Sequence, residues 1–137
     1  MPTLPSSKDS LLIRTNFSDA EAWSAALTVV FTENDDGFRA YVEIVDDSAW
    51  NNAEWERLRA VVLGNAEHAS VLFIVDGIAL GPDYPVLVVD LNDLSHQPFR
   101  CIARRLWSVD NNLNIANMDW EEFADDTGAD GVFRGFE

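Results

Sequence analysis

The sequence predicts a single α/β domain in which a mixed sheet of about five strands is flanked by three or four helices. Short runs of β-branched and aromatic residues alternate with segments whose apolar residues recur at helical spacing. The chain has 137 residues, the length of one domain, and 47% of them are hydrophobic. Two connections, at residues 76–84 and 92–98, are too short for a crossover helix, which favours a mixed sheet over a purely parallel one.

The first half of the chain supplies two strands and two helices. Residues 1–9 are polar and rich in Pro and Ser, so we expect a flexible N-terminal tail ahead of one domain at residues 10–137. A strand at residues 10–15 precedes a helix over about 19–31, for which Ser18 and Glu21 form the expected capping box. Residues 38–45 are rich in β-branched and aromatic residues and read as the second strand.

The next helix runs through residues 55–62, with Asn51 or Asn52 as its expected N-cap and Gly64 at its end. Strands at residues 71–75 and 85–91 follow, and their short linker predicts an antiparallel pair. Residues 99–102 form the fifth expected strand.

The last third of the chain ends in a helix and a docked tail. A capping box of Asp119 and Glu122 predicts a helix from about Trp120 to about Asp126. Val132 and Phe133 then predict that the glycine-rich tail packs on the core.

The charge of the chain excludes two classes of partner. It has 9 Lys and Arg against 24 Asp and Glu, a formal net charge of −15. Binding to nucleic acid or to an anionic membrane surface requires basic patches, so we expect neither. A surplus of negative charge can instead steer a basic protein towards the chain.

Cysteine usage and hydropathy predict a cytoplasmic protein. The single cysteine, Cys101, cannot form an internal disulfide, which a small secreted domain would usually need. The first residues lack the basic-then-apolar pattern of a signal peptide, and the longest apolar runs are far shorter than a membrane span.

Four segments carry a family resemblance. They are LIRTNFSD at residues 12–19, PVLVVDL at 85–91, NNLNIANMD at 111–119 and GVFRGF at 131–136. Together they resemble a family of bacterial, largely actinobacterial, single-domain proteins of unknown function. The resemblance covers most of residues 11–136 and implies no activity.

The asparagine-rich segment is the main candidate for a functional surface. Carboxamides both donate and accept hydrogen bonds, so a loop rich in them can bind a polar ligand or another backbone. Asparagine also favours left-handed turns and helix caps, so an architectural role stays open. The candidate binding residues here are Trp107, Asn111, Asn112, Asn114, Asn117 and Asp119.

Two further sets of charged residues are candidates. Arg104 and Arg105 follow a predicted strand and can bind a phosphate or carboxylate, or pair with carboxylates of their own chain. Asp46, Asp47 and Asp90 follow strands, where carboxylates can hold Mg²⁺ or simply form turns. If the strands ending at Asp76 and Asp90 are antiparallel neighbours, these two aspartates lie at opposite edges.

Catalytic motifs are not recognisable, and we assign neither catalytic residues nor a required cofactor. Cys101 lies within an apolar strand, where a thiol is inert. His68 and His96 lie in polar stretches without a nucleophilic partner in a known motif. Whether the chain is an enzyme stays undecided.

Two hypotheses of function follow. The first is a non-catalytic interaction module, immunity- or inhibitor-like, that presents an acidic face to a basic protein. The alternative is a small-molecule-binding protein or enzyme that uses the asparagine-rich segment and strand-end carboxylates, with or without a divalent metal. The sequence predicts no oligomeric state.

Overall fold

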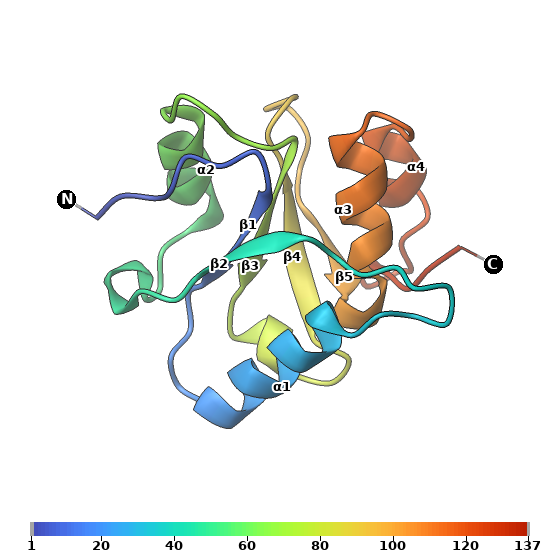
Figure 1. Ribbon diagram of the computed structural model, residues 1–137, viewed down its shortest axis with the longest axis horizontal. Coiled ribbons are helices and arrows are strands. Elements are labelled where there is room, and N and C mark those ends of the chain that lie inside the picture. Colours follow the sequence, from blue (N-terminus) through green and yellow to red (C-terminus); the bar gives the residue numbers. More distant parts are fainter. Residues whose placement is uncertain (1, 137) are drawn as a thin grey trace.

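The computed structural model describes residues 2–136 and contains one six-stranded mixed sheet (Figure 1). Its strands lie in the order β2-β1-β3-β4-β5-β6. They are β1 (Ser10–Arg14), β2 (Val42–Val45), β3 (Val71–Val75), β4 (Pro85–Asp90), β5 (Phe99–Ile102) and β6 (Val132–Phe133). The α/β class and the mixed sheet predicted from the sequence are confirmed.

One strand runs against the others. β1 is parallel to β2 and β3, and β5 is parallel to β6, whereas β4 is antiparallel to both β3 and β5. The register pairs Val71 with Asp90 and Ile74 with Leu87, which confirms the predicted antiparallel pair. Five strands therefore end at one edge of the sheet, which we call the carboxyl edge, and β4 ends at the other, the amino edge.

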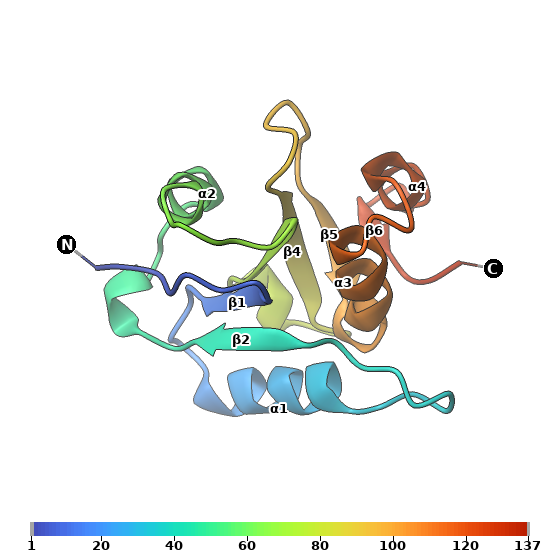
Figure 2. The ribbon, with the colours of Figure 1, turned by 45° about the horizontal axis from the view of Figure 1, so that its top comes forward.

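Four α-helices cover the two faces of the sheet: α1 (Ala20–Phe31), α2 (Trp55–Leu63), α3 (Leu106–Asn114) and α4 (Trp120–Ala124). Figure 2 shows α1 and α2 on opposite sides of β1 and β2. Side chains alternate between the two faces along a strand, so Leu12 packs with the residues of α1, α3 and α4 while Leu11 and Ile13 pack with those of α2. β1 is covered on both faces and is buried along its whole length.

Helix starts agree with the predictions in part. Asp119 and Glu122 form the predicted capping box of α4. The N-cap of α1 is Asp19, whose carboxylate accepts from the backbone N–H of Ala22 at 3.0 Å, and not Ser18, which bonds to Asn16 instead. A carboxylate so placed also suits the positive end of the helix dipole.

Two other element boundaries differ from the predictions. β2 begins only at Val42. The N–H of Tyr41 donates to the Asp110 carboxylate at 2.8 Å and not to a neighbouring strand. α2 has Glu54 at its N-cap, without a side-chain cap, because Asn52 takes a left-handed conformation and donates its N–H to Thr15 at 2.7 Å.

Both ends of the described chain pack on the domain. The predicted docking of the tail is confirmed, and it takes the form of a sixth strand: β6 pairs with β5 and places Phe133 against Phe123. At the other end Leu4 is buried beside Leu11, and Asn65 donates to the carbonyls of Leu4 and Pro5. No helix within residues 2–136 has both the length and the apolar character to cross a bilayer.

Candidate functional site

The asparagine-rich segment is a helix end and not a loop. Asn111, Asn112 and Asn114 lie in the second half of α3, and Asn117 lies in the turn that leads to α4. Ala116 takes a left-handed backbone conformation with φ of 55° in this turn. The segment therefore joins two helices at the amino edge of the sheet.

Asn114 and Asp110 form a partly buried polar junction between α3 and the starts of three strands. The amide nitrogen of Asn114 donates to Ser10 Oγ and to Asp110 Oδ1, both at 2.8 Å, and its oxygen accepts from the N–H of Ser70 at 3.0 Å. Asp110 also accepts from the N–H of Tyr41. Burial raises the pKa of Asp110, and the hydrogen bonds from Tyr41, Ser10 and Asn114 oppose that rise.

The amides of Asn112 and Asn117 hold the turn between the helices. Asn112 donates to the carbonyl of Ser108 at 2.8 Å and accepts from the Asn117 amide at 3.0 Å. The Asn112 carbonyl also accepts from the N–H groups of Asn117 and Met118. Their polar groups are thus engaged within the chain, which supports the architectural alternative for Asn112, Asn114 and Asn117.

The three aspartates considered for a metal do not meet. Asp46 and Asp47 follow β2 at the carboxyl edge, whereas Asp90 ends β4 at the amino edge. Asp46 instead contacts Arg14, with 3.2 Å between Oδ1 and Nη1. Within residues 2–136 no group of three or more His, Cys, Asp or Glu side chains has an arrangement that could hold a metal ion.

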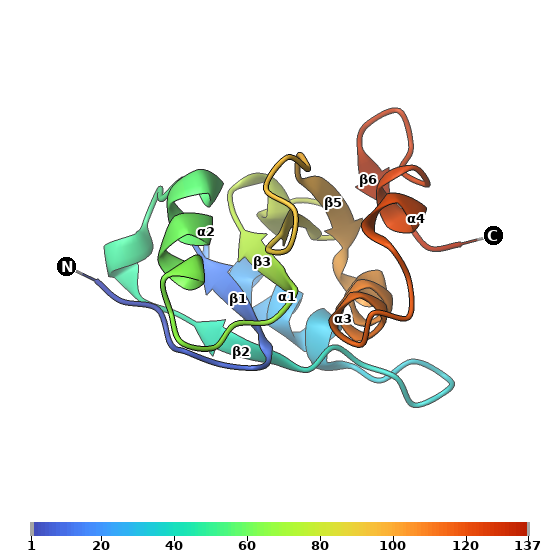
Figure 3. The same ribbon diagram turned by 90° about the horizontal axis from the view of Figure 1, so that it is seen from above.

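A strongly charged depression lies at the amino edge, between the β4–β5 connection and α4. Figure 3 looks onto this edge. It shows the β4–β5 connection, which lies between α2 on one side and α4 on the other. The depression has a volume of about 230 Å³ and includes four carboxylates, one imidazole and an apolar wall. We call it the acidic hollow, and its principal residues are Asp90, Asp93, His96, Leu113, Met118, Asp119, Trp120 and Glu121.

His96 occupies the centre of the acidic hollow. Its Nδ1 lies 2.6 Å from Oδ2 of Asp90, and its Nε2 lies 3.1 Å from Oε1 of Glu121 and 3.6 Å from Oδ2 of Asp93. The imidazole stacks on Trp120, with ring centroids 5.6 Å apart and planes 7° apart.

The surroundings of His96 favour its charged form. The hydrogen bond to Asp90, together with the charges of Asp93, Asp90 and Glu121, raises its pKa above the ordinary value of 6.5, although partial burial opposes the rise. Only the imidazolium can donate from both ring nitrogens to carboxylates at once. The hollow thus changes its charge when this one side chain titrates.

The sequence pointed to two residues of the acidic hollow, Asp90 and Asp119, and missed its centre. His96 had no recognisable partner in the sequence because Glu121 approaches it only after α4 folds back. The one available signal was the spacing of Asp90, Asp93 and His96, three residues apart within a short connection between strands.

Arg104, Arg105 and Trp107 line a separate depression of about 290 Å³ together with Asn34, Asp35 and Asp36. It lies between the turn that follows α1 and the start of α3. The sequence predicted the arginines and the tryptophan as candidate binding residues, but not the acidic turn that lines the same depression.

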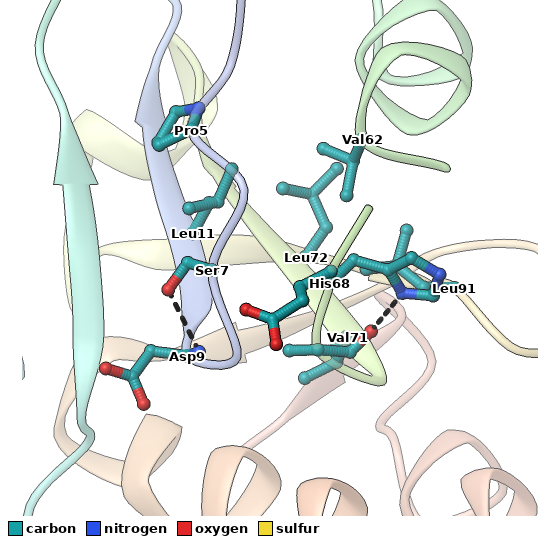
Figure 4. A pocket seen from close by; sticks show the side chains of 11 residues that line it. Pro5, Ser7, Asp9, Leu11, Val62, His68, Val71, Leu72 and Leu91 are labelled. Atoms are coloured by element: carbon teal, nitrogen blue, oxygen red, sulfur yellow. Dashed lines mark hydrogen bonds between the residues drawn. The ribbon is translucent and has the colours of Figure 1, made fainter. Parts of the chain in front are cut away.

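A small, partly open pocket lies under the N-terminal residues beside His68 (Figure 4). Ser7 accepts from the N–H of Asp9 at 3.1 Å on one side, and Nδ1 of His68 lies 2.7 Å from the carbonyl of Ala69 on the other. Its volume is about 10 Å³, roughly the room that one water molecule needs, so it is too small for a ligand.

A family model described as "Domain of unknown function (DUF6924)" matches residues 9–136. No curated protein matches the chain. The match spans nearly the whole sequence and agrees with the resemblance to a single-domain family of unknown function.

Proposed function

Because the chain belongs to the DUF6924 family of unknown function, we propose its function from the geometry: it is a non-catalytic interaction module that binds a basic protein through the acidic hollow. An arginine or lysine side chain of the partner enters the hollow. We place this encounter in the cytoplasm, in keeping with a chain whose single cysteine cannot form an internal disulfide.

The observation that carries the proposal is the composition of the hollow. Four carboxylates line it, and neither Lys nor Arg is among its lining residues. Leu113, Met118 and Trp120 add an apolar wall. A basic side chain has an apolar stem and a cationic head, so it matches both parts of this surface. A guanidinium can also make two parallel hydrogen bonds to one carboxylate.

The surface next to the hollow extends the same charge. Glu122, Asp125 and Asp126 are exposed on and just after α4, and residues 119–130 contain no basic residue. Such a field accelerates the encounter with a basic protein and weakens with added salt. Other carboxylates, Asp35 and Glu54 among them, lie elsewhere on the chain, so the hollow and not the net charge defines the binding site.

His96 gives the hollow a competitor of its own. When protonated, its imidazolium occupies the carboxylates that a partner's guanidinium would contact. The neutral imidazole has only one N–H, so it can donate to only one of these carboxylates and leaves the other available. Binding of a basic side chain is therefore expected to tighten as the pH rises through the pKa of His96.

The test compares two triple variants of the full chain as bait in a lysate of the source organism. Asp93→Asn, Asp119→Asn and Glu121→Gln neutralise the hollow while keeping side-chain shape and the cap of α4. Asp47→Asn, Glu54→Gln and Glu56→Gln make the same charge change beside α2. We expect the wild type and the variant with changes beside α2 to retain a basic protein. The variant with a neutralised hollow should not retain it, and high salt should release it from the wild type. Equal capture by both variants would refute the proposal.

A further inference from the structure

We propose that Arg104, Arg105 and Trp107, together with the turn at residues 34–36, form a binding site for a small zwitterion of the α-amino-acid type. This site is independent of the acidic hollow and does not rest on the proposed function. We call it the zwitterion site.

The dimensions of the zwitterion site suit a small ligand. Its volume of about 290 Å³ lies just below the range of about 300–1,000 Å³ that is usual for pockets holding drug-sized molecules. Its walls come from two segments far apart in sequence, the turn between α1 and β2 and the start of α3.

Arg104 and Arg105 differ from the other cations of this acidic chain. Within residues 2–136 neither has an ion pair or lies over an aromatic ring. Each of the other basic residues does one or the other: Lys8, Arg14, Arg100 and Arg134 pair with carboxylates, and Arg14, Arg39, Arg57 and Arg59 lie over rings. In a chain with 24 acidic residues, two adjacent arginines without an ion pair among residues 2–136 are available to an acceptor on a ligand.

Two buried donors at this site also lack an acceptor. Nε of Arg105 and the indole nitrogen of Trp107 are both buried and have no hydrogen-bond partner within the described residues. A buried donor without an acceptor destabilises a fold, so such groups are uncommon in folded proteins. Both atoms are shielded from solvent in the ligand-free chain, so a ligand carboxylate reaches them only when the Arg105 or Trp107 side chain shifts.

The opposite wall carries negative charge that is held in place. Asn34 Oδ1 accepts from the N–H groups of Asp36 and Phe38, both at 2.9 Å, which fixes the turn. Phe38 then stacks on Trp107, with ring centroids 5.3 Å apart and planes 11° apart. Asp35 and Asp36 thus line the same depression as the arginines, and neither comes within ion-pair distance of them.

This arrangement selects for a ligand that carries both charges. A simple anion would be attracted by the arginines but repelled by Asp35 and Asp36. A simple cation would be attracted by the aspartates but repelled by the arginines. In an α-amino acid the carboxylate can face Arg104 and Arg105 while the ammonium faces the aspartates. Trp107, which lines the depression and is backed by Phe38, offers an apolar surface to its side chain.

The experiment titrates the full chain with L-leucine, 4-methylpentanoate and isoamylamine, and follows the indole N–H resonance of Trp107 by NMR. The two analogues are leucine without its ammonium and leucine without its carboxylate. We expect saturable binding of leucine and about tenfold or greater weakening for each analogue. The absence of a saturable shift with leucine, or equal binding of 4-methylpentanoate, would overturn the proposal.

Variants then test each wall. Arg104→Gln, at an exposed side chain, and Asp35→Asn with Asp36→Asn are each expected to weaken leucine binding about tenfold or more. Arg134→Gln removes an exposed arginine from β6's end and is expected to leave binding unchanged. Loss of binding in the Arg134 variant, or full binding in the Arg104 variant, would contradict the assignment.

Discussion

Nδ1 of His96 lies 2.6 Å from a carboxylate oxygen of Asp90 that ends β4, and the same imidazole lies flat against Trp120 at the start of α4. The stacking of His96 on Trp120 joins the β4–β5 connection to α4, which follows it in the chain by more than twenty residues. Asp90 is 5% exposed and also accepts from the N–H of Asn92, so the base of the acidic hollow is fixed before any partner arrives.

The first prediction concerns the pH dependence of stability. Because the pKa of His96 in the fold is raised above 6.5, its ion pairs stabilise the protein fully below 6.5, and this contribution is lost as the pH rises through the folded pKa. The free energy of unfolding of the wild type should therefore fall over that interval relative to His96→Gln. Urea titrations at several pH values measure it, and parallel profiles for the two proteins would contradict the expectation.

The second prediction compares how much two asparagines of α3 contribute to stability. Asn114→Ala removes hydrogen bonds to Ser10, Asp110 and the Ser70 N–H, and should lower the free energy of unfolding by about 2–4 kcal/mol. Asn111→Ala, on the same helix but without a side-chain hydrogen bond in the described residues, should change it by at most about 0.5 kcal/mol. Equal effects in denaturant titrations would remove the architectural assignment of Asn114.

The third prediction compares two ion pairs. Arg100 donates to both carboxylate oxygens of Asp76, at 2.9 and 2.7 Å, and both side chains are largely buried. Burial alone would raise the pKa of Asp76, but the hydrogen bonds and charge of Arg100 outweigh it and hold the pKa below its ordinary value. The stabilisation that this ion pair gives the fold is thus fully present above pH 3.8 and is lost as the pH falls through the lowered pKa of Asp76.

Asp76→Asn leaves the Arg100 charge without its partner, and should lower the free energy of unfolding by about 1–3 kcal/mol at pH 7. Asp130→Asn, which breaks the exposed pair with Arg134, is the matched control and should change the free energy of unfolding much less than Asp76→Asn does. A control effect as large as that of Asp76→Asn would contradict this difference.

The fourth prediction concerns Cys101. Its thiol is fully buried in β5, and burial raises its pKa far above the ordinary range, with a small opposing effect of Arg105. Since the thiolate is the reactive form, Ellman's reagent should modify the folded protein only at the rate of unfolding and the denatured protein at once. Rapid modification of the folded chain would contradict the burial of this strand.

Local patterns predicted the sheet better than the site. The short linker at residues 76–84 was enough to predict that β3 and β4 are antiparallel, and so that Asp76 and Asp90 lie at opposite edges. The asparagines suggested a loop because Asn is a weak helix former, but the apolar contacts of Leu106 and Val109 keep this segment helical. Tertiary packing overrode the local preference there.

The acidic hollow could not be predicted because its contacts join distant segments. Glu121 reaches His96 only after α3 and the following turn bring α4 back to the amino edge. The facing walls of the zwitterion site are likewise more than sixty residues apart, and the stacking of Phe38 on Trp107 brings them together. Sequence spacing carries no signal of either contact.

The central claim, that the acidic hollow accepts a basic side chain, is tested most directly by NMR titration of the full chain with two peptides. One is acetyl-Gly-Arg-Gly-amide, and the other has uncharged citrulline in place of arginine. We predict saturable shifts of the His96 ring and Trp120 indole with the arginine peptide, and a lowered His96 pKa in its complex, because the bound cation competes with the imidazolium. The citrulline peptide should bind about tenfold or more weakly. Equal responses to the two peptides, or none to either, would contradict the claim.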